Sequence, residues 1–146
     1  MTDTQKTLID TNILVYSIDS SANPEKRRIA KEIIKSGFEG KEEFYIAVQN
    51  LEELATVSTS KIENPISWQE IGGYIEEIIN WPKFKIVETT EKSVLNSIEI
   101  RKKNNTDYWD AVIASAMKEN SIQKIHTENA QDFDQISGIE AENPFK

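Results

Sequence analysis

The sequence predicts an α/β domain of three layers, in which helices cover both faces of a central, mostly parallel sheet. Short apolar runs, each long enough for one strand, alternate along the chain with longer segments whose apolar residues recur at helical spacing. This alternation is typical of parallel strands joined by crossover helices. The 146 residues contain no internal repeat and no linker rich in proline or glycine, so we expect one domain over residues 1–146.

In the first half of the chain we predict a strand at 7–9, helices at 11–18 and 24–36, a strand at 44–47 and a helix at 48–59. The first strand is a short apolar run that stops at Asp10. Pro24 suits the first position of a helix and Gly37 suits its end. The helix at 48–59 rests on the spacing of its apolar residues, which are Val48, Leu51, Leu54 and Ala55.

In the second half we predict helices at 68–80, 90–103 and 107–120, strands at 84–87 and 122–126, and a short edge strand at 136–141. Pro65 and Ser67 introduce the first of these helices and Pro82 ends it. The helix at 90–103 ends in basic residues, as the helix dipole favours. The helix at 107–120 has the clearest apolar face, made of Trp109, Val112, Ile113, Ala116 and Met117.

Composition excludes several classes of protein. The absence of cysteine excludes a disulfide framework, thiol catalysis and thiolate zinc sites. No apolar run reaches the roughly 20 residues of a spanning helix, and the N-terminus has no signal-peptide pattern. We therefore expect a soluble cytoplasmic protein. The formal net charge of −8 argues against binding nucleic acid through bulk positive potential, unless some acidic residues converge and hold cations.

Acidic residues follow the predicted strands and open two of the predicted helices. In a parallel sheet, sites form beyond the carboxyl ends of the strands. The residues there are Asp10, Glu52, Glu53, Asp107, Asp110 and the polar stretch 127–132. Each also has an ordinary structural interpretation, because Asp10 and Asp107 suit helix caps and most helix glutamates are solvated. Spacing places Glu52 beside the apolar face of its helix and Glu53 well away from it.

Carboxylates that gather at one place raise one another's pKa and cost stability unless a cation lies between them. Mg²⁺ is the usual cation for such a set, because it prefers oxygen ligands. The single histidine, His126, is expected to be structural rather than a metal ligand.

Three segments resemble the PIN-domain ribonucleases, and among these the VapC-like toxins of toxin–antitoxin pairs. The segments read LIDTNILVYSID, AVQNLEEL and DYWDAVIASAMKENSIQKIHTENAQDF, and they span most of the chain from Leu8 to Phe133. The resemblance implies an α/β/α domain whose acidic residues hold Mg²⁺ or Mn²⁺ and hydrolyse RNA. It assigns catalytic roles to Asp10, Glu53 and Asp110, with Thr11, Asn12 and Thr127 in support. Glu52 is the one-residue alternative to Glu53.

The last segment departs from the family pattern. The family often has aspartate two residues after the threonine that follows the fourth strand, where this chain has Asn129. Asp132 is a candidate for the missing carboxylate, and Asp107 is a further one. We therefore expect the metal ligands among Asp10, Asp110, Glu53, Asp132 and Asn129, with one tight metal favoured over two. The alternative is a PIN-like domain that has lost catalysis and serves as an RNA- or protein-interaction module.

The partners implied are RNA (tRNA, rRNA or mRNA), a cognate antitoxin and a second copy of the chain in a homodimer, but no membrane. Lys26, Arg27, Arg28 and Lys31 form one basic cluster that could contact RNA, and 101–103 form another; a solvated face is the alternative for both. The apolar face of the helix at 68–80 could form a dimer or antitoxin surface, although a core role is favoured. Two other Mg²⁺-dependent α/β classes, receiver domains and haloacid-dehalogenase-like phosphatases, fit poorly because their acidic motifs are absent.

Overall fold

A computed structural model describes residues 5–146, with five strands and seven helices in that range. The strands are β1 (Lys6–Ile9), β2 (Glu43–Ala47), β3 (Phe84–Val87), β4 (Lys124–His126) and β5 (Glu140–Glu142). The helices are α1 (Thr11–Ile18), α2 (Pro24–Phe38), α3 (Val48–Ser60), α4 (Trp68–Asn80), α5 (Glu91–Lys103), α6 (Tyr108–Glu119) and α7 (Ala130–Asp134).

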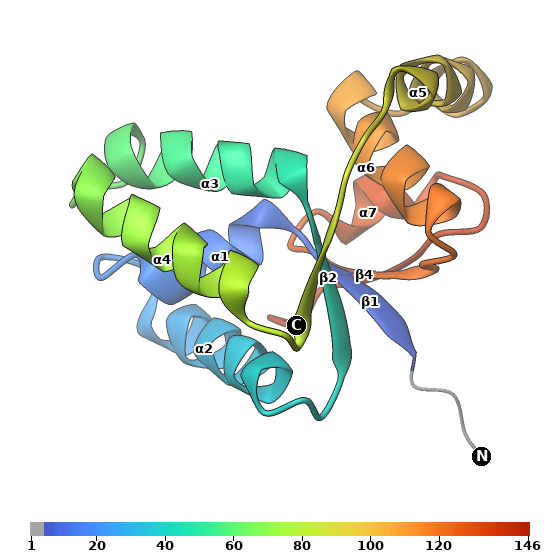
Figure 1. Ribbon diagram of the computed structural model, residues 1–146. Helices are drawn as coiled ribbons and strands as arrows, with labels where there is room; N and C mark the ends of the chain where they lie inside the picture. The colour runs from blue at the N-terminus through green and yellow to red at the C-terminus, as the bar shows by residue number, and fades with distance from the viewer. Residues whose placement is uncertain (1–4) are drawn as a thin grey trace.

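All five strands form one parallel sheet in the order β3-β2-β1-β4-β5, with helices on both faces (Figure 1). Alternate residues of each strand point to opposite faces, and both faces are buried. Ile9, Phe44 and Ile46 pack against α1–α4, whereas Leu8 and Tyr45 pack on the side of α5–α7. The predicted three-layer α/β/α architecture is therefore confirmed.

The helix α2 runs two residues beyond its predicted end and contains Gly37 rather than stopping at it. Gly37 is buried, and a Cβ there would lie 2.5 Å from Phe44 Cδ2 and 2.7 Å from Phe84 Cζ. The glycine therefore allows close packing of α2 on the sheet.

Near the C-terminus two predicted strands need correction, and one helix was missed. The strand β4 begins at Lys124, because Ser121 adopts a left-handed φ of 58° and Ile122 closes the turn that follows α6. The short helix α7 was not predicted. The edge strand β5 lies at Glu140–Glu142 rather than at 136–141, so that Ile136 and Ile139 fill the core from the preceding turn.

The apolar face predicted for α6 is correct at three of its five members. Ile113, Ala116 and Met117 are buried, whereas Val112 is only partly buried and Trp109 is 60% exposed. On α4, Ile71 and Ile78 belong to the core, as favoured, whereas Trp68 is exposed. No helix within residues 5–146 is both long and apolar enough to cross a membrane.

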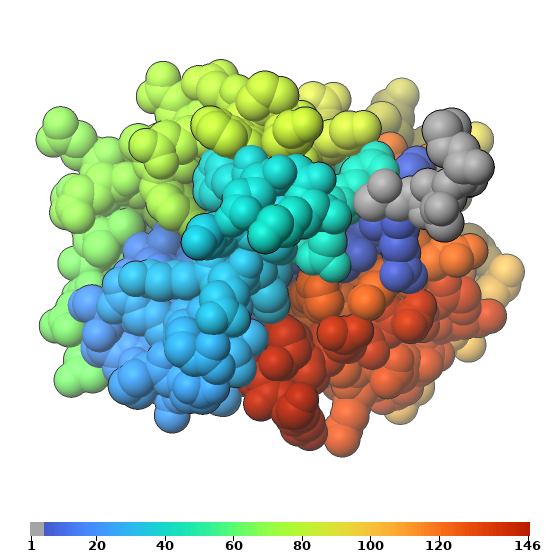
Figure 2. Space-filling model, turned by 90° about the horizontal axis from the view of Figure 1, so that it is seen from below, coloured from blue at the N-terminus to red at the C-terminus, as the bar shows by residue number. Residues whose placement is uncertain are grey.

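The C-terminal segment returns to the N-terminal half of the molecule. Phe145 packs edge-on against Tyr16 of α1, with ring centroids 5.0 Å apart, and the ammonium group of Lys26 in α2 lies 5.8 Å from the Phe145 ring. Figure 2 shows this segment, in red, beside the blue surface of α2.

The chain order along the sheet reverses at β1, since β2 lies on one side of it and β4 on the other. Ligands of open parallel sheets bind beyond the carboxyl ends of the strands at such a switch point. Asp10 directly follows β1, and Thr127 directly follows β4. The fold therefore brings two of the predicted site residues to the expected place.

Candidate active site

A cleft of about 850 Å³ opens beyond the carboxyl ends of β1, β2 and β4. Its walls come from α1, α3, the first two turns of α6 and the loop after β4. Predicted site residues in the lining are Asp10, Thr11, Asn12, Glu52, Glu53, Asp107, Asp110 and Asn129. Segments that are far apart in the sequence thus contribute carboxylates to one cavity.

Asp10 is nearly fully buried, with 8% of its surface exposed. Its backbone N–H donates to the carbonyl of His126 at 3.0 Å, which ties the end of β1 to the end of β4. Its carboxylate accepts the backbone N–H of Thr11 at 2.8 Å and caps α1. The capping interpretation of Asp10 is therefore correct, and it coexists with a place in the cleft.

Three side chains also donate to the carboxylate of Asp10. The distances are 2.7 Å from Thr127 Oγ1, 3.2 Å from Asn50 Nδ2 and 3.4 Å from Asn12 Nδ2. Burial raises the pKa of Asp10 above its ordinary value, although these hydrogen bonds oppose the rise. The surrounding residues therefore fix the orientation of the carboxylate, and burial makes its negative charge costly.

The contact from Asn50 was not predicted. Asn50 is fully buried; its amide donates to Asp10 and, at 3.0 Å, to Thr11 Oγ1, while its Oδ1 accepts the backbone N–H of Ala47 at 3.0 Å. The sequence does contain a signal for it, because Asn50 lies one helical turn before the buried Leu54. A polar residue on a buried helix face needs buried partners.

Glu53, rather than Glu52, is the glutamate of α3 that meets the other site residues. Glu53 accepts hydrogen bonds from Thr11 Oγ1 at 3.2 Å and from Gln49 Nε2 at 2.7 Å, whereas Glu52 is exposed. The expectation from spacing, which placed Glu52 beside the buried face, was wrong, since that face of α3 includes the polar Asn50 and Ser58 and is turned toward Glu53. The resemblance had named Glu53, with Glu52 as its alternative.

Asp110 lies in the first turn of α6 and is partly buried. Its pKa is raised to about 6, first by loss of solvation and then by the negative charges of Asp10, Asp107, Asp132 and Glu53. Asp107 is the N-cap of α6 and accepts the backbone N–H of Trp109 at 3.1 Å, so its predicted capping role is confirmed.

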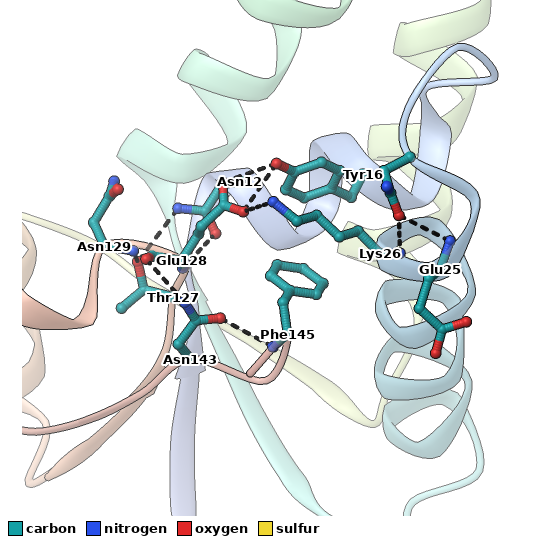
Figure 3. Close-up of polar contacts among 10 residues, drawn as sticks. Asn12, Tyr16, Glu25, Lys26, Thr127, Glu128, Asn129, Asn143 and Phe145 are labelled. Atoms are coloured by element: carbon teal, nitrogen blue, oxygen red, sulfur yellow. Dashed lines mark hydrogen bonds and ion pairs between the residues drawn. The ribbon is translucent and has the colours of Figure 1, made fainter.

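The loop after β4 is held in place by hydrogen bonds (Figure 3). Thr127 Oγ1, which donates to Asp10, accepts the backbone N–H of Asn129 at 3.0 Å and the amide of Asn12 at 3.3 Å. The side chain of Asn129 is exposed at the edge of the cleft. Asp132 is not in the cleft lining and instead lines an adjacent pocket, so of the two only Asn129 faces the cleft.

Glu128 also lines the cleft and was not among the predicted residues. Its carboxylate accepts the Tyr16 hydroxyl at 2.8 Å and pairs with the ammonium of Lys26 at 2.7 Å (Figure 3). The polarity of the predicted loop was the only sequence signal for it. Glu128 is therefore already neutralised by a cation of this chain.

The carboxylates surround the cleft without meeting at one point. Within the described range 5–146, no three His, Asp or Glu side chains are close enough to hold a metal ion together. Like charges repel, and this repulsion adds to the loss of solvation in raising the pKa of Asp110. The donor set consists of oxygen atoms, and Asp10 is already oriented, so the chemistry of the cleft suits a hard divalent cation.

The predicted basic cluster on α2 is largely engaged with carboxylates. Arg28 lies between Glu25 and Glu32, and Lys26 pairs with Glu128. The side chain of Lys31 is exposed, and Arg27 has a buried Nε that makes no hydrogen bond. The second cluster, 101–103, lies at the end of α5 and does not line the cleft.

Three solved structures illustrate the likeness of this fold to known ones. A toxin–antitoxin complex from Klebsiella pneumoniae has a TM-score of 0.63 at 18% identity, covering 94% of this chain and 97% of that one. VapBC2 from Rickettsia felis, bound to a DNA fragment from its promoter, has a TM-score of 0.69 at 19% identity, with coverage of 95% and 98%. VapC20 from Mycobacterium tuberculosis, described as a sarcin-ricin loop cleaving toxin, has a TM-score of 0.63 at 13% identity, with coverage of 82% and 86%. At these identities the likeness shows a shared fold.

The sequence itself matches one family model. Residues 7–139 match the model described as the PIN domain. No curated protein sequence matches the chain at a significant level.

Proposed function

The chain belongs to the PIN-domain family, and from this premise we propose that it is a divalent-metal-dependent endoribonuclease, the toxin of a toxin–antitoxin pair. One observation carries the proposal. Asp10, Glu53 and Asp110 come from three separate segments and line a single cleft, where burial, together with the charges of neighbouring carboxylates, raises the pKa of Asp110 to about 6. Carboxylates in such an arrangement favour a cation between them.

In this proposal Asp10 and Asp110 hold Mg²⁺ or Mn²⁺. A cation bound there lowers the pKa of water and offsets the charge that develops on the phosphate. Thr11, Asn12 and Thr127 keep the carboxylate of Asp10 oriented toward the cleft. Glu53 accepts a proton from the attacking water or binds the cation through water. The expected products carry a 5′-phosphate and a 3′-hydroxyl.

Asn129 supports one tightly bound cation rather than two. Its amide oxygen is a neutral donor at the edge of the cleft, where a carboxylate would bind a second cation more strongly. Asp132 would supply a carboxylate only if α7 moved, because its side chain lines the neighbouring pocket.

Lys26 is the member of the α2 cluster best placed to contact the RNA backbone. It borders the pocket next to the cleft, and its ion pair with Glu128 leaves the ammonium at the junction of the two cavities. The other three basic residues of the cluster would add only long-range attraction, which salt screens.

A small antitoxin is the expected protein partner, in line with the toxin–antitoxin complex among the structural neighbours. We also propose a homodimer. The exposed apolar residues Ile79 of α4 and Val94 and Leu95 of α5 are candidates for one of these interfaces.

The second candidate function is a PIN-like interaction module without catalysis. Asn129 favours it, since a neutral side chain there weakens the binding of a second cation. The intact set of Asp10, Glu53 and Asp110 favours the ribonuclease.

The test is cleavage of total tRNA and rRNA by purified protein shown to be free of antitoxin, with Mg²⁺ or Mn²⁺. We expect discrete fragments with 5′-phosphate ends, and at least a 100-fold loss of rate in Asp10→Asn and Asp110→Asn and with EDTA. Asp134→Asn is the matched control, because Asp134 is exposed and lies outside the cleft lining. A well-folded protein that leaves every RNA intact with either metal would support the interaction module instead.

A further inference from the structure

Trp109 is a large apolar side chain that the fold leaves in solvent beside the candidate catalytic aspartate. It is 60% exposed, lines the cleft and immediately precedes Asp110 in the first turn of α6. Its indole meets the Tyr108 ring edge-on, with centroids 5.2 Å apart and an angle of 71° between the ring planes. This contact supports the indole from one side.

The cleft also contains apolar groups that the hydrolysis of a phosphodiester does not require. Val15, Val57 and Ile113 line it together with the carboxylates. A phosphate group gains nothing from such side chains, whereas the face of a nucleobase is apolar and packs well against them.

Lys61 supplies positive charge at the same cleft. It is the single basic residue in the lining formed by the described part of the chain, and none of the ion pairs found within residues 5–146 includes it. Lys61 is exposed and follows the last turn of α3. The cleft therefore combines an aromatic ring and an unpaired ammonium with an acidic interior.

Resting on the proposed ribonuclease function, we infer that Trp109 and Lys61 make the cleft selective for unpaired RNA. Trp109 stacks on one base close to the scissile phosphate, and Lys61 binds a backbone phosphate of the same strand. Bases in a duplex are already stacked on their neighbours and cannot present a free face, whereas bases in loops and single strands can. Trp109 is thus a specificity residue that acts on substrate binding.

The experiment compares binding of a fluorescein-labelled 12-nucleotide RNA with binding of the same RNA annealed to its complement. Ca²⁺ replaces Mg²⁺, and a gel verifies that the RNA stays intact. The proteins are the wild type, Trp109→Ala, Trp109→Phe, Lys61→Ala and Trp68→Ala. Trp68 is the matched control, because it is 67% exposed but lies on α4 outside the cleft lining.

We expect Trp109→Ala to weaken binding of the single strand by about 5- to 150-fold, the usual effect of removing one stacking platform. The duplex, expected to bind weakly, is unaffected. Trp109→Phe retains most of the affinity but loses the quenching of tryptophan fluorescence that the single strand causes in the wild type. Lys61→Ala reduces the slope of log affinity against log salt by about 0.7, the value for one phosphate contact on a single strand. Trp68→Ala binds as the wild type.

Equal single-strand affinity in the wild type and Trp109→Ala overturns the inference, as does an equal loss for single strand and duplex. Loss of antitoxin binding in Trp109→Ala, with RNA binding unchanged, assigns the indole to a protein interface and also overturns it. The outcome is separable from that of the proposed function. Binding that depends on Trp109 without any cleavage supports the inference and rejects the catalytic function. RNA cleavage with single-strand binding that is unchanged in Trp109→Ala supports the catalytic function and rejects the inference.

Discussion

Asn50 is the residue that connects the start of α3 to the candidate catalytic residue Asp10. Its side chain makes three hydrogen bonds in a fully buried position, two of them to Asp10 and Thr11. Buried polar groups cost free energy when a partner is removed, because water cannot replace it. The orientation of Asp10 therefore depends on a residue that itself does not line the cleft.

Asn50→Ala is expected to lower the free energy of unfolding by about 3 kcal/mol, since it leaves the N–H of Ala47 and the carboxylate of Asp10 short of partners. Asn64→Ala is the matched control: Asn64 is exposed, and the change should fall within about 0.5 kcal/mol. Urea unfolding in EDTA measures both variants. If Asn50→Ala lowers the free energy of unfolding no more than Asn64→Ala does, the hydrogen bonds of Asn50 do not stabilise the site.

Asp110 gives the metal-free protein a characteristic pH dependence. Its pKa is raised to about 6 in the folded protein, against an ordinary value of 3.8. A carboxyl group whose pKa is raised by folding contributes stability when protonated, and this stability is lost as the pH rises through about 6. Its ionised form therefore destabilises the fold at neutral pH until a cation is bound.

Asp110→Asn should accordingly raise the Tm of the metal-free protein at pH 7.5 by about 2–4 °C, the shift expected for roughly 1 kcal/mol in a chain of this size. At pH 4 the gain should largely disappear, because the group is then protonated in the folded protein and about half protonated in the unfolded chain, whose ordinary pKa is 3.8. Scanning calorimetry in EDTA measures the difference between the variants at each pH. Buried His126, whose pKa is lowered by burial, destabilises wild type and variant alike on acidification and cancels in this difference. A gain of equal size at both pH values would contradict the account.

The separate site residues were predictable to different degrees. Asp10 and Asp110 could be predicted, because each follows a strand or opens a helix that the apolar pattern defines clearly. Asn50 and Glu128 had only weak sequence signals, a polar residue on a buried helix face and a polar loop. The importance of both comes from contacts with residues far away in the sequence. Trp109 was placed in the core by its spacing, but the first turn of a helix at a cleft edge has no neighbour to cover it.

At the scale of elements, α2 shows how packing overrides local signals. A glycine near the end of a helical pattern usually marks the end of the helix. Here α2 continues through Gly37, because the helix approaches Phe44 and Phe84 too closely for any side chain. The strands and long helices were otherwise predictable from periodicity, while the five-residue helix α7 is too short to show any.

Gly37→Ala is expected to destabilise the fold by about 1–3 kcal/mol through overpacking. This cost exceeds the roughly 1 kcal/mol that alanine gains over glycine within a helix. Gly72→Ala in α4 is the matched control, because nothing lies within 4 Å of a Cβ at that position. It should stabilise the protein by about 0.5–1 kcal/mol. Thermal and urea unfolding of the pair test the packing of α2, and a stabilised Gly37→Ala variant would refute it.

At the scale of the whole molecule, the topology determines which acidic residues can act together. The chain carries 25 acidic residues against 17 basic ones, and most of the carboxylates are solvated or paired on the surface. The reversal of strand order at β1 brings Asp10, Glu53 and Asp110 to one cleft. The net charge alone could not identify this place, whereas the alternation of strands and helices could, because it predicts where the strands end.

The most direct measurement is the anomalous X-ray scattering of manganese from crystals of the wild-type protein grown with Mn²⁺. The account predicts a peak between the carboxylates of Asp10 and Asp110, with metal–oxygen distances of roughly 2.0–2.3 Å, and its loss in Asp110→Asn. Manganese bound only to acidic residues elsewhere on the surface, with the cleft carboxylates free of it, would contradict the central claim that this cleft is a metal-dependent catalytic site.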